Sequence, residues 1–138
     1  VYKRQVERAG VKPMPGRQIP IWFGGFAPVA FKRAARLGDG FMFGGGHADN
    51  LAAYDQVQAC LQAQGRDPGS FGIEAFMNYQ SGPDQWRAEA EDWHTRGADY
   101  VSMRAMKLRG QGDGLQSPQD HIDALESYWR AVADLAER

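Results

Sequence analysis

The sequence of 138 residues predicts an α/β fold of four consecutive βα units with parallel strands. Short apolar runs with a period of two are followed by longer stretches in which apolar residues recur every three or four positions. Glycine-containing turns separate these runs. Four such units are half of an eight-stranded (β/α)8 barrel, which needs about 250 residues when complete. An open, doubly wound four-stranded sheet has the same order of elements and remains an alternative.

The first unit combines a short strand, a glycine turn and a helix. Apolar residues alternate from Ile19 to Phe23, and the pair Gly24-Gly25 ends the run. Pro28 then stands in the first turn of the helix, where its missing N–H costs nothing. The helix carries an apolar stripe at the expected spacing, which consists of Ala27, Ala30, Phe31, Ala34 and Ala35.

The other three units follow the same scheme. Their strands are expected at 40–43, 72–78 and 99–103, and their helices at about 49–64, 84–95 and from Ser117 as N-cap to near 136. Gly65 and Gly97 end the two middle helices. Each helix has an apolar face that we expect to be buried: Leu51, Tyr54, Val57 and Leu61 in the first of the three, Trp86, Ala90 and Trp93 in the second, and Ile122, Leu125, Trp129 and Val132 in the third.

Composition excludes several classes of protein. With 43% hydrophobic and 24% charged residues the chain has the balance of a soluble globular domain, and a net charge of −1 without a basic block predicts no nucleic-acid partner. No apolar run approaches the roughly 20 residues of a membrane-spanning helix, and no signal peptide is visible. Cys60 is the single cysteine, so no internal disulfide is possible and a reducing cytoplasm is the expected location.

Two glycine turns are candidate anion sites. A helix N-terminus has unpaired N–H groups and a partial positive charge, which favour a phosphate, and glycine allows the backbone to approach it. The turn Gly24-Gly25-Phe26-Ala27 offers such donors, although its glycines are equally explained by a tight turn alone. A second run, Gly44-Gly45-Gly46, follows the next strand. Because both turns follow the carboxyl ends of neighbouring parallel strands, we expect them to lie side by side at the same edge of the sheet. We call this edge the rim.

Other motifs give weaker signals. The three histidines lack a metal-ligand spacing, so no metal site is predicted. His47 follows the second glycine turn and is a candidate for a rim position, with an exposed loop histidine as the alternative. The turn after the first strand lacks the G-x-G-x-x-G spacing of dinucleotide-binding folds. No Ser-His-Asp or Cys-His set can be assigned.

Five segments taken together resemble the C-terminal half of luciferase-like monooxygenases. In order, they are IPIWFGG, RAARLGDGF, GRDPGSFGI, GADYVSMRAM and DHIDAL. The resemblance implies a flavin- or deazaflavin-dependent (β/α)8 enzyme whose fifth to eighth strands are present here. It divides the chain into a lead-in, residues 1–18, and a half-barrel, residues 19–138. The start at Val1 rather than methionine fits a piece of a longer protein.

The resemblance also implies a site. The family's cofactor-phosphate turn maps onto Gly24, Gly25, Phe26 and Ala27, and the adjacent strand end maps onto Phe43, Gly44 and Gly45. Because Phe26 and Ala27 replace polar residues of some members, phosphate contacts are expected from backbone N–H groups. Arg104 stands where related sequences carry a small polar residue, and it is either a substrate or phosphate contact or a surface arginine.

The implied cofactor is FMN or coenzyme F420, and the implied partner is a small-molecule substrate. Most catalytic residues of the family belong to the other half of the barrel, so this chain alone is expected to be inactive. The full-length protein is expected to be a homo-oligomer. The alternative is a non-catalytic half-barrel that self-associates and thereby covers its open strand edges.

Overall fold

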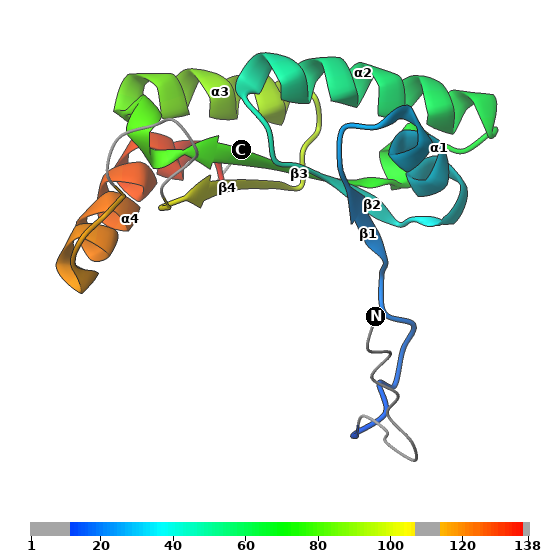
Figure 1. The fold of residues 1–138 in the computed structure, drawn as a ribbon, viewed down its shortest axis with the longest axis horizontal. Helices are drawn as coiled ribbons and strands as arrows, with labels where there is room; N and C mark the ends of the chain where they lie inside the picture. The colour runs from blue at the N-terminus through cyan, green and yellow to red at the C-terminus, as the bar shows by residue number, and fades with distance from the viewer. Residues whose placement is uncertain (1–11, 107–113, 137–138) are drawn as a thin grey trace, which may run out of the picture.

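The computed structural model describes residues 12–106 and 114–136, which form a four-stranded parallel sheet with helices (Figure 1). The strands lie in chain order, and they are β1 (Trp22–Gly24), β2 (Gly40–Phe43), β3 (Gly72–Asn78) and β4 (Tyr100–Arg104). The helices are α1 (Pro28–Leu37), α2 (His47–Ala63), α3 (Pro83–Thr95) and α4 (Pro118–Val132). Three short 3-10 segments complete the order: η1 (Pro68–Ser70), η2 (Tyr79–Ser81) and η3 (Ala133–Leu135).

The placement of the helices distinguishes the two architectures that the sequence allows. Figure 1 shows α1, α2 and α3 on one side of the sheet. At the β4 end, α4 packs against α3, and it contacts the same face through Val101 and Met103. A doubly wound sheet has helices on both faces, whereas barrel helices all lie outside the strands. The α/β fold is therefore that of half a TIM barrel.

The core lies between the sheet and this helix layer. Alternate strand residues point into it, as β3 shows with Ile73, Ala75 and Met77 buried and the residues between them half-buried. The other side of the sheet, which we call the open face, carries Trp22, Met42, Glu74, Phe76, Tyr100, Ser102 and Arg104. In a complete barrel this face would line the interior.

Trp22 covers the amino-terminal end of the open face. Its ring lies over Gly40 and Gly72, where an added Cβ would come within 2.5 Å and 2.3 Å of ring atoms. Tyr100 extends this aromatic layer, with its ring centroid 6.0 Å from that of Trp22. The two glycines are therefore required by the tryptophan, because a Cβ at either position would clash with its ring.

The first strand is shorter than predicted. It begins at Trp22, and the side chains of Ile19 and Ile21 are exposed rather than buried. Ile21 is bonded to Asp39, the residue before β2: the Asp39 carboxylate accepts the Ile21 N–H at 2.8 Å, and the Asp39 N–H donates to the Ile21 carbonyl at 2.8 Å. The ladder of β1 with β2 begins at the next residue, Trp22.

The predicted buried face of α4 is wrong for three of its four residues. Ile122, Leu125 and Trp129 are 48%, 54% and 59% exposed, and only Val132 is buried. The helix packs instead through Tyr128, whose hydroxyl donates to the Val101 carbonyl at 2.6 Å and whose ring meets Trp86 edge-on. This contact rotates the apolar stripe away from the sheet.

Other boundaries and faces agree with the sequence. The range of β3 is as predicted, and the starts of the four helices lie within two residues of their predicted positions. Trp86 and Trp93 are buried, and Gly65 and Gly97 have the positive φ of residues that end helices. On α1, Phe31, Ala34 and Ala35 are buried, whereas Ala27 is exposed at the helix start.

Candidate functional site

The carboxyl end of β1 leads into a helix start that no side chain caps. Gly24 ends the strand, and Gly25 has a φ of +120°, which favours glycine. Ala27 is the N-cap of α1 and cannot cap it with its methyl side chain, and the first turn has no acidic residue. The N–H groups of Phe26 and Ala27 donate to no other described residue. The α1 start therefore presents free donors and a partial positive charge.

The second glycine turn is held from inside the helix layer. Asn50, which is 1% exposed, accepts the Gly45 N–H through Oδ1 at 2.7 Å and donates through Nδ2 to the Gly45 carbonyl at 3.3 Å. These bonds fix the peptide group before α2, and they occupy the Gly45 N–H. Gly45 can therefore shape the rim but offers no free donor to an anion.

Asn50 was not identified from the sequence, although a signal was present. It stands on the same helical stripe as Ala53, Val57 and Leu61, all of which are buried. A polar residue on an apolar stripe needs an internal partner, because an unpaired buried amide is costly. Such a residue just after a glycine run is a candidate for a turn-fixing role.

Phe26 joins the two turns into one rim. Its ring lies against Gly45, where an added Cβ would come within 2.6 Å of Phe26 Cζ. A groove of about 430 Å³ runs beside this contact between α1 and α2, and Asp49 lines it. Asp49 lies in the first turn of α2, so that helix start already has a negative charge beside it. The α1 start is the more favourable place for an anion.

The open face carries polar residues on β3 and β4, next to the rim. Ser102 donates its hydroxyl hydrogen to Glu74 Oε1 at 2.7 Å, which joins β4 to β3. Arg104, the last residue of β4, extends over the ring of Phe76, with Cζ 5.6 Å from the ring centroid. Its Nη1 lies 3.6 Å from the position that a Cβ of Gly44 would take. The arginine thus reaches from β4 across β3 to the turn after β2.

The site therefore consists of an open sheet face, a rim with free backbone donors and an arginine beside it. The family model of luciferase-like monooxygenases matches residues 2–138. The chain belongs to this family. Membership indicates oxidoreductase activity in general, and family members commonly use a flavin or F420. Among curated proteins, no match to the chain was found.

Two site residues predicted for this luciferase-like chain face the helix layer. The Phe43 side chain is buried in the core and stacks on Trp93 with ring centroids 5.4 Å apart, so only its backbone reaches the rim. His47 points toward α3, where its Nε2 lies 3.2 Å from Asp92 Oδ2 and its Nδ1 lies 4.0 Å from Glu89 Oε2. In this position His47 joins α2 to α3.

Glu74 and Ser102 are further open-face residues that sequence reasoning missed. The clue was a carboxylate inside the apolar run of β3, at a position in register with Tyr100 of β4. Because Glu74 accepts the hydrogen bond from Ser102, its carboxylate is held against the sheet below Arg104. The pair adds polar character to a face that otherwise carries aromatic and apolar side chains.

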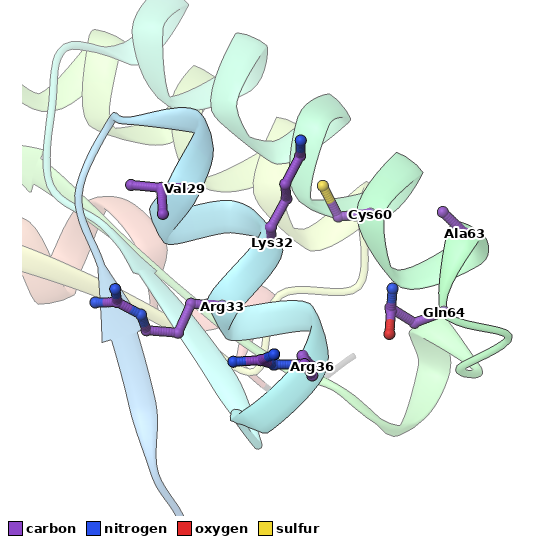
Figure 2. A pocket seen from close by; sticks show the side chains of 7 residues that line it. All are labelled: Val29, Lys32, Arg33, Arg36, Cys60, Ala63 and Gln64. Carbon is purple, nitrogen blue, oxygen red and sulfur yellow. The ribbon is translucent and has the colours of Figure 1, made fainter.

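A separate groove lies on the outer surface of the luciferase-like fold. A groove of about 450 Å³ is lined by Lys32, Arg33 and Arg36 of α1 and by Cys60 of α2. Figure 2 shows Lys32 nearest to Cys60, whereas the Arg33 side chain extends away from α2. The three cations are exposed and lie off the buried stripe of α1. No residue of a strand end lines this groove, so it is distinct from the rim.

Two features are absent from the described ranges, 12–106 and 114–136. No group of three or more His, Cys, Asp or Glu residues there could hold a metal ion. Within the same ranges, every helix is too short or too polar to cross a membrane.

Proposed function

We propose that this chain supplies the cofactor-phosphate corner of a flavin- or F420-dependent oxidoreductase of the monooxygenase type, acting on a small molecule in the cytoplasm. The observation that carries the proposal is the uncapped start of α1, with free N–H groups at Phe26 and Ala27 beside the positive-φ Gly25. A phosphate at this position would accept hydrogen bonds from the backbone and interact with the helix dipole.

The residues present fit a phosphate group. The α1 start has no carboxylate in its first turn, and Gly25 has no side chain to obstruct the approach. Phe26 and Ala27 have no polar side-chain atoms, so specificity for an anion comes from the backbone alone. The contact of Phe26 with Gly45 keeps this backbone next to the second turn.

A bound flavin or deazaflavin would supply the redox chemistry. The chain's own residues would hold the phosphate at the rim and close the amino end of the open face with Trp22. Four strands provide half of a barrel wall. We therefore expect the chain alone to bind cofactor weakly and to lack turnover, with the catalytic residues on the strands that complete the barrel.

The test compares Gly25→Asp with Gly25→Asn. Both variants place a side chain of the same size at a φ of +120°, so they share the backbone strain and differ in charge. If the phosphate binds here, Gly25→Asp should bind FMN at least about tenfold more weakly than Gly25→Asn, a difference of about 1.4 kcal/mol. Riboflavin, which lacks the phosphate, should bind both variants equally.

Fluorescence titration measures both affinities. The same pair of variants is titrated with F420 and with its phosphate-free deazaflavin, which identifies the preferred cofactor. Equal FMN and F420 affinities for the two variants would remove this turn from the site. Absence of micromolar binding of either cofactor to the full-length wild-type protein would refute the functional proposal.

A self-associating half-barrel is the second candidate. Its support is the exposed apolar surface at both edges of the sheet, which includes Ile21 at one edge and Tyr100 and Trp129 at the other. Exposed strand edges and large apolar patches are typical of interaction surfaces. Light scattering of the chain at tens of micromolar tests this candidate, since a monomer would contradict it.

A further inference from the structure

We propose that Arg104 forms a second anion subsite on the open face, which binds a carboxylate or similar oxyanion of the substrate. This inference rests on the proposed function in one respect: it takes the open face to be the substrate-binding surface. The two subsites use different donors: the phosphate corner uses backbone N–H groups at the α1 start, and the Arg104 subsite uses the guanidinium at the end of β4.

Arg104 is placed to meet a ligand. It ends β4 in register with Asn78, at the carboxyl end of the sheet where barrel sites lie. Its guanidinium is positioned by Phe76 below and by the turn at Gly44, where the missing side chain leaves room for Nη1. Stacking on an aromatic ring holds the guanidinium plane while leaving its N–H groups free to bind.

The hydrogen bonding of Arg104 is incomplete. Its Nε is fully buried and has no hydrogen-bond partner. Within the described residues, no carboxylate lies within 4 Å of this guanidinium. A buried N–H without a partner costs about 1–3 kcal/mol, so it calls for an explanation such as a ligand.

The other half-buried arginines show that this is unusual within the described chain. Arg66 donates to the carbonyls of Ala35 and Gly38, at 3.0 Å and 2.7 Å. Arg87 is paired with Glu91 and Asp134, and Arg96 is paired with Asp92. Arg104 is the member of this group that is left without an acceptor, and it is the one on the open face.

The chemistry of the missing acceptor follows from the guanidinium. Its donors form a planar fork that matches the two oxygens of a carboxylate, or two of a phosphate or sulfonate. Glu74, the nearby carboxylate of the open face, accepts a hydrogen bond from Ser102 at 2.7 Å and does not pair with Arg104. No described residue supplies the acceptor, so we assign it to a ligand, and the adjacent ring of Phe76 favours one with an apolar part.

The experiment uses benzoate as the probe and benzamide as its neutral counterpart. Two-dimensional NMR of the arginine Nε–H groups follows each arginine separately, and the Arg104 signal is identified by its loss in Arg104→Lys. We expect benzoate to shift the Arg104 signal along a saturable curve and benzamide to leave it unchanged. Small, linear shifts of all arginine signals would overturn the proposal.

Variants separate this subsite from general charge effects. Arg104→Met should weaken benzoate binding at least tenfold, whereas Arg33→Met, which removes an exposed arginine from the outer groove, should not change it. Arg104→Lys retains the positive charge but lacks the planar guanidinium with its paired N–H donors. This variant should bind benzoate with an affinity between those of the wild type and Arg104→Met. Unchanged benzoate binding in folded Arg104→Met would refute the subsite.

Titrations with FMN identify the source of the oxyanion. If Arg104 binds substrate, Arg104→Met should change FMN and riboflavin affinities equally, and benzoate should bind in the presence of FMN. A selective tenfold loss of FMN affinity, with displacement of benzoate by FMN, would assign Arg104 to the cofactor phosphate and overturn the substrate assignment. Failure of the Gly25 test with an intact benzoate response would refute the phosphate corner alone.

Discussion

The starts of α1 and α4 differ in one respect that matters for function. Each helix has a proline in its first turn, Pro28 in α1 and Pro118 in α4. In α4, Ser117 Oγ accepts the Asp120 N–H at 3.2 Å, and the Asp120 carboxylate accepts the Ser117 N–H at 2.8 Å. The α1 start has no such side chains. A helix that caps itself has no need of a ligand, whereas an uncapped one beside a glycine turn can bind an anion.

The start of α2 is intermediate between these two. Its N-cap is Gly46, which has no side chain, but Asp49 lies in its first turn and Asn50 binds the peptide group of Gly45. The donors before α2 are therefore partly used by the chain itself. The fewer donors of a helix start the chain itself uses, the better that start can bind an anion. The expected order as anion sites is therefore α1, then α2, then α4.

The largest expected effect comes from removing the internal support of the α2 turn. Asn50→Ala deletes both hydrogen bonds to Gly45 and should lower the free energy of unfolding by about 1–3 kcal/mol, since partly buried backbone groups lose their partners. Urea denaturation measures this change. Gln62→Ala, at an exposed position of the same helix, is the control and should be close to neutral. An Asn50→Ala protein as stable as this control would show that the turn needs no support.

The next effect comes from giving α1 the cap that it lacks. Ala27→Asp should stabilise the helix by about 1 kcal/mol, because the new carboxylate can accept an N–H group of the first turn, as N-cap side chains do. The same carboxylate would compete with a phosphate, so FMN affinity should fall about tenfold or more. Ala27→Asn adds a neutral cap and should weaken FMN binding less. A stabilised Ala27→Asp variant with wild-type FMN affinity would separate the helix start from the cofactor site.

Removing the cap of α4 should have a smaller effect. Ser117→Ala should lower the free energy of unfolding by about 1 kcal/mol and leave FMN affinity unchanged, because no ligand is expected at this helix start. Thermal or urea denaturation gives the first quantity and titration the second. Ser127→Ala in the same helix serves as the control. Weaker FMN binding in Ser117→Ala alone would contradict the ranking of the helix starts.

The smallest effect is a pH dependence of the α4 cap. Hydrogen bonds from Ser117 lower the pKa of Asp120 below its ordinary value of about 3.9. A lowered pKa in the folded state means that this stabilisation is present above pH 4 and is lost as pH falls through the folded pKa. The stability difference between wild type and Asp120→Asn should therefore shrink on acidification to pH 3. A constant difference from pH 7 to pH 3 would contradict this assignment.

Local patterns predicted most of the fold. The range of β3 and the cap of α4 follow from alternation and from the Ser-Pro start, which depend on neighbours in the sequence. The adjacency of the two glycine turns followed from parallel topology, and the contact of Phe26 with Gly45 confirms that adjacency. These features needed no knowledge of distant side chains.

Tertiary contacts determine the features that sequence patterns did not predict. The face that α4 buries depends on Tyr128 reaching the carbonyl of Val101, and the role of Asn50 depends on which side of α2 meets the sheet. The position of Arg104 depends on Phe76 and Gly44, which come from two other units. The contacts of Tyr128 and Arg104 join residues from different units, whose relation is visible only once the strands are in register.

The aromatic layer of Trp22 and Tyr100 sets a limit on ligand length. Tyr100 and Arg104 are separated by four steps along one strand, or about 13 Å at roughly 3.3 Å per residue. Under the proposed function, a ligand on the open face has about this length before it extends past the strand ends to the rim, where the free donors of α1 stand.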